Sequence, residues 1–133
     1  MAKLVGIDFG TKRVGVAVSD ESGSVAFPKT TLANDRALIP AVVTIIRQEN
    51  AVDVVVGKSV NRDGEDNAVM DNIRTFVSEL EKAVAVTIHY EPEFYTSREA
   101  RREGQTGPVD AQAAAIILNS YIAKTKKHDN HTR

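Results

Sequence analysis

The chain has 133 residues, of which 42% are hydrophobic and 26% are charged, and its formal net charge is −1. This balance is typical of one globular domain with a buried core, and it excludes a disordered or fibrous chain. The absence of cysteine excludes thiol catalysis, thiolate metal sites and disulfides. No apolar run approaches the roughly 20 residues of a membrane-spanning helix, and the amino terminus does not resemble a signal peptide. We therefore expect a cytoplasmic protein with no membrane partner.

Alternating apolar residues and turn signals predict three hairpin-linked strands at the start of the chain. Residues 3–9 form an apolar segment, and the turn at 10–12 leads into a second apolar segment at 13–19. A third strand is expected at 24–31. Pro28 favours an edge or irregular position for it, because proline cannot donate a hydrogen bond to a neighbouring strand.

The remainder of the chain alternates between strand and helix patterns. The expected elements are strands at 51–57 and 84–90, and helices from Asn34 or Asp35 to 49, at 69–80, at 96–103 and from 108 or 109 onward. This order predicts an α/β fold with a five-stranded mixed sheet, in which three antiparallel strands precede the parallel ones and helices flank the sheet. The domain is expected to span 1–124, and 125–133 to form a polar, flexible tail.

Three acidic residues occupy positions that such a fold could bring together. Asp8 lies in an apolar strand, where an unpaired charge is costly, so it requires a strand end, a cation or a proton. Glu93 follows the fifth strand after Pro92, and Asp110 stands at the start of the final helix. Each also has an ordinary interpretation, as a turn aspartate, an exposed loop carboxylate and a helix cap, respectively.

The combination of the three acids predicts a metal site. Clustered carboxylates repel one another unless cations are present, and oxygen-only ligands favour Mg²⁺ or Mn²⁺. Two such ions about 3.5–4 Å apart can activate a water and stabilise the leaving oxygen of a phosphodiester. This chemistry needs no histidine base. The three histidines have no metal-ligand spacing and are expected at the surface: His89, His128 and His131.

Several segments resemble the bacterial YqgF-type family, whose members are described as Holliday junction resolvases and as pre-16S ribosomal RNA nucleases. The segment VGIDFGTKRVGVAVSD at 5–20 is similar to the family's opening motif, and VDAQAAAIIL at 109–118 is similar to its last helix. Weaker matches lie at 54–64 and 93–100. The resemblance covers about residues 3–123.

This resemblance implies an RNase H-like fold and a metal-dependent nuclease in which Asp8, Glu93 and Asp110 are both the catalytic residues and the ligands of Mg²⁺ or Mn²⁺. The family usually reads Asp-Glu-Arg where this chain reads Pro92-Glu93-Phe94, so only the middle acid matches. Glu91 therefore remains an alternative ligand to Glu93. The family's Gly-x-Pro after the fourth strand is also changed here, to Gly-Lys-Ser.

Basic residues around the proposed site are candidates for binding the phosphates of structured RNA or branched DNA. Each could equally be an ordinary exposed base. These candidates are Arg13, Lys12, Lys58, Arg62 and Arg98.

Two other functions compete with a nuclease. One is a non-catalytic nucleic-acid-binding or regulatory module that retains the fold. The other is a sugar-kinase-like or actin-like ATPase, for which 133 residues are too few. The sequence does not separate RNA from DNA as substrate, and a homodimer is expected if the substrate is a two-fold symmetric junction.

Overall fold

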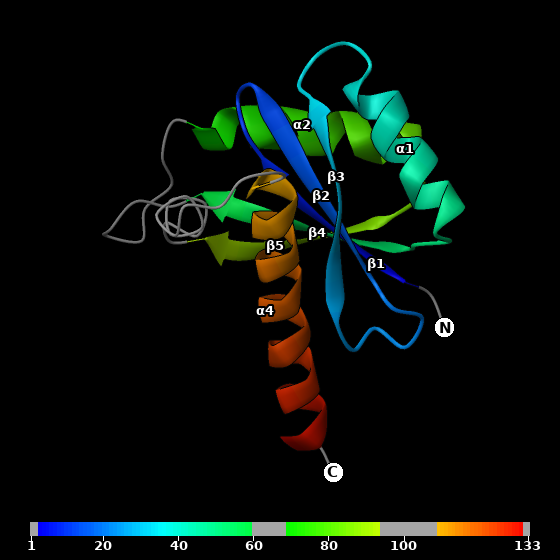
Figure 1. The fold of residues 1–133 in the computed structure, drawn as a ribbon, viewed down its shortest axis with the longest axis vertical. Helices are drawn as coiled ribbons and strands as arrows, with labels where there is room; N and C mark the ends of the chain where they lie inside the picture. Colours follow the sequence, from blue (N-terminus) through cyan, green and yellow to red (C-terminus); the bar gives the residue numbers. More distant parts are fainter. Residues whose placement is uncertain (1–2, 60–68, 94–108, 132–133) are drawn as a thin grey trace.

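The computed structural model describes residues 3–59, 69–93 and 109–131. In chain order the elements are β1 Leu4–Phe9, β2 Arg13–Ser19, β3 Ala26–Ala33, α1 Leu38–Gln48, β4 Asp53–Ser59, α2 Val69–Ala83, β5 Thr87–Glu93 and α4 Val109–His131 (Figure 1). The helix expected at 96–103 lies outside the described residues.

The five strands form one sheet in the order β3-β2-β1-β4-β5. Strand β1 pairs antiparallel with β2 and parallel with β4, while β2–β3 is antiparallel and β4–β5 is parallel. The predicted mixed sheet is therefore confirmed. Both prolines of the sheet lie in edge strands, Pro28 in β3 and Pro92 in β5, where a missing N–H need not break an interior ladder.

Helices cover both faces of the sheet. The larger core packs α1 and α2 against one face, and the smaller core packs α4 against the other (Figure 1). Because successive strand residues face opposite ways, Val5 and Ile7 of β1 enter the larger core, whereas Gly6 and Asp8 face α4. A methyl group at Gly6 would lie 2.9 Å from the Cβ atom of Leu118, so the glycine allows α4 to pack closely on the sheet.

Several boundaries differ from the sequence expectation. Strand β3 begins two residues later than predicted, and α1 begins at Leu38 with Ala37 at its N-cap and no side-chain cap. Asp35 instead accepts a hydrogen bond from the Ala37 N–H at 2.9 Å, so it stabilises the turn before the helix. Helix α1 ends where Asn50 adopts a left-handed φ of 55°, which asparagine tolerates better than most residues.

The last two strands also shift toward the carboxyl terminus. Strand β5 begins at Thr87, because Val84 and Val86 pack on the larger core from the connection rather than from the sheet. Strand β4 likewise begins at Asp53, and β5 extends to Glu93, so Glu93 is the final residue of the strand rather than part of the loop beyond it.

Helix α4 continues beyond the expected domain boundary at residue 124. It runs from Val109 to His131, so residues 125–131, expected as a tail, continue the helix. Despite its 23 residues, α4 is too polar to cross a bilayer, and none of the other helices in the described ranges qualifies either.

Candidate active site

Asp8 lies near the carboxyl end of β1 and is only 7% exposed. Its backbone pairs with Gly15 of β2, and its position in the alternating strand places it on the face that α4 covers. The sequence expectation of a buried charge at a strand end is therefore met. A buried carboxylate in this position requires compensating charge or hydrogen bonds from its surroundings.

Asp110 reaches the same end of the sheet from the first turn of α4. The helix can begin there because Gly15 has no side chain: a methyl group at this glycine would overlap the carbonyl group of Asp110 and lie 2.8 Å from the Ala111 nitrogen. Asp8 pairs with this same glycine. The fold therefore brings the backbones of Asp8 and Asp110 together through Gly15, a role that the sequence motif alone did not reveal.

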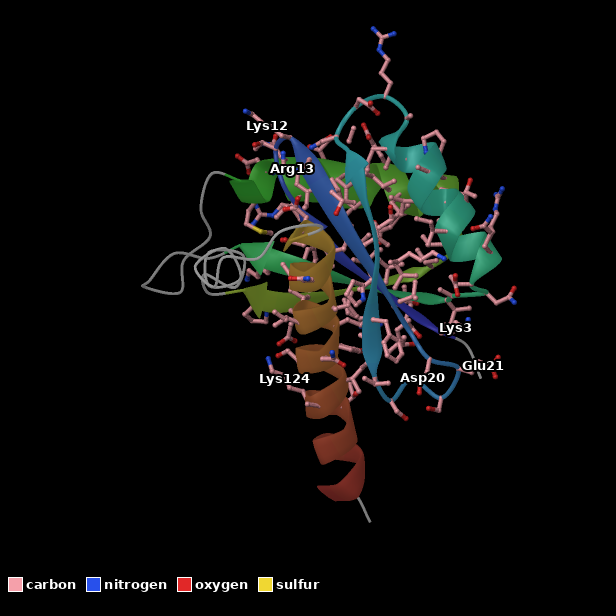
Figure 2. The ribbon with its side chains drawn as sticks, viewed as in Figure 1. Lys3, Lys12, Arg13, Asp20, Glu21 and Lys124 are labelled. Atoms are coloured by element: carbon pink, nitrogen blue, oxygen red, sulfur yellow. The ribbon has the colours of Figure 1, made fainter. Side chains whose placement is uncertain are left out.

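Arg13, at the start of β2, bonds directly to this acid. Its Nε donates to Oδ2 of Asp110 at 2.9 Å, with the arginine side chain 60% exposed and the aspartate side chain 17% exposed. Because Nε makes this contact, the two terminal nitrogens of the guanidinium remain available for a second anion as far as the described residues are concerned. Figure 2 shows Lys12 and Arg13 together at the end of the sheet where α4 begins.

The positive end of α4 adds to this electrostatic environment. Unpaired N–H groups at a helix N-terminus carry partial positive charge, which stabilises nearby carboxylates. Asp110 is an acid of the first helical turn and Asp8 faces the same turn across Gly15. The guanidinium of Arg13 and the start of α4 thus both compensate the charge of Asp110.

Glu91 is directed to a different part of α4. It is 3% exposed, and its Oε2 accepts a hydrogen bond from Ser120 at 2.8 Å and pairs with Lys124 at 2.7 Å. Ser120 lies ten residues after Asp110, which corresponds to roughly 15 Å along the helix. The Glu91 carboxylate therefore joins β5 to the middle of α4, and Figure 2 shows Lys124 well down the helix from Arg13.

The other predicted site residues are placed in part or not at all. The backbone of Glu93 ends β5 and pairs with Ser59, but its side chain lies outside the described part of the structure. Arg62 and Arg98 also lie outside it. Lys12 is exposed in the β1–β2 turn and Lys58 is half-buried in β4. Among the described residues, no three acidic or histidine side chains form a group that could hold a metal.

The prediction that His89 lies at the surface is wrong. It is half-buried between β5 and α4, hydrogen-bonded to Asp53 at 2.9 Å and packed against Tyr121 in a tilted arrangement with ring centroids 5.1 Å apart. Burial, with the nearby charges of Asp53 and Glu91, raises the pKa of Tyr121. Together with the Glu91 contacts, these residues make a polar interface that anchors the edge strand to α4. His128 and His131 have no described side chains.

Comparisons with known proteins agree with this architecture. The model of a family described as "RuvX: Holliday junction resolvase" matches residues 2–124. A protein of Nitratidesulfovibrio vulgaris is 37% identical over 90% of this chain and 92% of its own length, and one of Maridesulfovibrio salexigens is 35% identical over 92% and 98%. Both carry the name "Putative pre-16S rRNA nuclease".

Solved structures share the fold at low sequence identity. Thermus thermophilus RuvC in complex with a Holliday junction substrate superposes with a TM-score of 0.62 at 13% identity, covering 95% of this chain and 96% of that one. The fowlpox virus resolvase in complex with Holliday junction DNA gives 0.58 at 11% identity, over 92% and 98%. The expected RNase H-like fold is confirmed.

Proposed function

This chain belongs to the RuvX family of Holliday junction resolvases, a family of nucleases, and on that premise we propose that it hydrolyses nucleic-acid phosphodiesters with divalent metal held by Asp8, Glu93 and Asp110. The observation that carries the proposal is the meeting of Asp8 and Asp110 at Gly15. Two acids from the first strand and the last helix converge at the end of the sheet where a charged substrate can approach.

The donor chemistry fits Mg²⁺ or Mn²⁺. Carboxylate oxygens are the ligands that these ions prefer, and nucleases of this family generally depend on a divalent metal. A pair of bound ions would supply an activated water and stabilise the leaving oxygen. The chain's own contribution is to hold the acids in place: β1 fixes Asp8, and Arg13 holds the carboxylate of Asp110.

Glu93 is the third ligand in this proposal because of its position in β5. The two-residue period of a strand puts position 93 on the same face as 91, the face covered by α4, and one strand period nearer the carboxyl end of the sheet. The Glu91 carboxylate is already bound by Ser120 and Lys124. These contacts favour Glu93 over Glu91 as the partner of Asp8 and Asp110.

Arg13 is proposed to bind a substrate phosphate through its two terminal nitrogens while its Nε retains Asp110. Lys12, next to it in the turn, adds a second exposed positive charge at the same end of the sheet (Figure 2). Lys58, Arg62 and Arg98 are proposed as further phosphate contacts because they are basic residues expected near the site. Binding of these cationic side chains would release counterions from the nucleic-acid phosphates, so the affinity for nucleic acid should fall as the salt concentration rises.

For the substrate we propose the 5′ end of pre-16S ribosomal RNA, on the names of relatives at 35–37% identity over nine-tenths of the chain. The alternative is a four-way DNA junction, which the family description and the structural neighbours name for themselves. A junction resolvase should act as a homodimer, whereas trimming of RNA requires only one active site. We also propose a cytoplasmic location, which suits a chain without cysteine.

Cleavage of both substrates by the purified protein in Mn²⁺ tests the proposal. Asp8→Asn should reduce cleavage by at least about 10²-fold and weaken Mn²⁺ binding measured by calorimetry. Asp71→Asn is the matched control, because Asp71 is an acid on α2 with 88% of its side chain exposed. Equal cleavage by the Asp8→Asn and wild-type proteins would refute the proposed site, whereas binding of either substrate without cleavage by the wild type would favour a non-catalytic binding module.

A further inference from the structure

An open cavity of about 350 Å³ lies on the face of the sheet opposite α4, between the β1–β2 turn, the β3–α1 connection and α2. Its volume falls in the range of small-molecule sites, which is about 300–1,000 Å³. Its apolar lining comes from Phe9, Leu38, Ile39 and Phe76. Phe9 and Phe76 pack together with ring centroids 5.2 Å apart, so an aromatic surface is part of the wall.

The polar lining accepts hydrogen bonds and carries negative charge. Asn72 and Glu79 of α2 contribute an amide and a carboxylate, and Asn34 and Asp35 contribute the same two groups from the other side. None of the described residues lining the cavity is basic. The cavity therefore disfavours phosphate and favours a flat, uncharged ring that donates N–H groups.

Several of these groups remain available to a ligand. Asn72, Thr11 and Glu79 are exposed, and within the described ranges none of their side chains makes a hydrogen bond. Asn34 is held differently: its Nδ2 donates to the Gly10 carbonyl at 2.8 Å, which fixes the amide at the edge of the cavity. The carbonyl oxygen of that amide is the part left to accept a bond.

The position of the cavity relates it to the proposed active site. Phe9 follows Asp8 directly, so their backbones are about 3.8 Å apart while their side chains face opposite sides of the sheet. Lys12 stands in the turn between the two faces (Figure 2). A strand of nucleic acid crossing this turn could place a phosphate at Lys12 and Arg13 and the adjacent unpaired base in the cavity.

We propose that this cavity binds one unpaired nucleobase of the substrate, with guanine favoured. Guanine presents adjacent N1–H and N2–H₂ donors that match the two oxygens of the Glu79 carboxylate, whereas uracil presents a single N–H. The Phe9 ring contributes stacking, which is how proteins commonly hold bases of single strands. This inference rests on the proposed function, because it assigns part of the same substrate to a second face of the protein.

Titration of the metal-free, full-length protein with nucleosides tests the proposal by NMR. Guanosine, which carries no phosphate, should shift the amide signals of Thr11, Asn34 and Asn72 and bind at least about fivefold more tightly than uridine. Glu79→Gln should abolish this preference. Glu81→Gln, a change of the same kind at an exposed acid of α2 outside the cavity, should leave it unchanged.

The two proposals fail in different ways. If millimolar guanosine leaves these amide signals in place while Mn²⁺-dependent cleavage is observed, the base site is refuted and the nuclease stands. Equal binding of guanosine and uridine, or a preference that survives in Glu79→Gln, also overturns the inference. If guanosine binds as expected but cleavage is absent, the cavity remains a base site and the nuclease proposal fails.

Discussion

Replacing Gly15 with alanine is expected to displace the first turn of α4 and with it Asp110. The new methyl group would overlap the Asp110 carbonyl and lie 2.8 Å from the Ala111 nitrogen, whereas ordinary contact begins near 3.4 Å. To reach ordinary contact, the Ala111 nitrogen must move away from the new methyl group by at least about 0.6 Å, and the Asp110 carbonyl must move further. Both obstructing groups are backbone atoms, so no side-chain rotation can relieve the contact.

Two magnitudes follow from this displacement. Overpacking of this kind costs about 1–3 kcal/mol, which for a chain of this size lowers Tm by roughly 4–12 °C. A misplacement of about 1 Å in a catalytic group can reduce the rate by about 10²-fold. Gly15→Ala should therefore lose most of its nuclease activity and bind Mn²⁺ more weakly even at temperatures where it is folded.

Gly6→Ala is the control, because it introduces the same methyl group beneath the first half of α4, away from Asp110. There the methyl would lie 2.9 Å from the Cβ atom of Leu118 and 3.0 Å from the Ala114 carbonyl. Ala114 lies about one helical turn beyond Asp110, and Leu118 lies about two turns beyond it. The Tm of Gly6→Ala should also fall, but by less than that of Gly15→Ala because these contacts are longer, and its activity should stay close to that of the wild type where the protein is folded. Thermal unfolding, Mn²⁺ calorimetry and cleavage assays compare the variants. If Gly15→Ala retains wild-type Mn²⁺ affinity and cleavage, the convergence of Asp8 and Asp110 at this glycine does not make the site.

Three further changes probe the ion pairs. Arg13→Gln should change the free energy of unfolding by less than about 1 kcal/mol, because Arg13 is largely exposed. It should also reduce by about one unit the slope of log binding constant against log salt concentration for nucleic-acid binding. An unchanged slope would contradict the phosphate contact. Lys124→Met should destabilise the protein by about 1–3 kcal/mol in urea denaturation, because Ser120 would be the one partner left to the buried Glu91 carboxylate among the described side chains. Adding Glu91→Gln should recover part of this loss, and no recovery would indicate that the ion pair is not its cause. Hydrogen bonding to Lys3 holds the pKa of Glu49 below its ordinary value of 4.5. The ionised Glu49 therefore stabilises the folded protein above pH 4.5, and this stabilisation is lost as the pH falls through the lower pKa of the folded state. Tm measured across this acidic window should fall more steeply for the wild type than for Glu49→Gln, and parallel curves would refute the assignment.

The fold could be predicted from the sequence because its signals are local and strong. The apolar alternation of β1 and β2 and the periodic stripe of α2 identify elements from neighbouring residues alone, and their order limits the topology. Pro28 correctly indicated an edge strand. Boundaries were less well determined, since Val84 and Val86 have the alternation of a strand but pack on the core from a connection.

The candidate site was only partly visible in the sequence. The family motifs indicated Asp8 and Asp110, but they gave Gly15 no role, and Arg13 was expected to face substrate rather than to bond Asp110. Glu91 and Glu93 could not be separated, because the distinction depends on which residues of α4 lie opposite β5. The catalytic, metal-binding and substrate-binding assignments all stay predictions, those of Asp8 and Asp110 included.

The sequence by itself determined which segments form strands and helices, and hence the mixed sheet, since hydrophobic periodicity acts over a few residues. Only the tertiary structure decided which distant groups meet. Arg13 and Asp110 are 97 positions apart, and their contact depends on how α4 crosses β2 at a residue without a side chain. Such contacts arise from packing between elements, which no local pattern specifies.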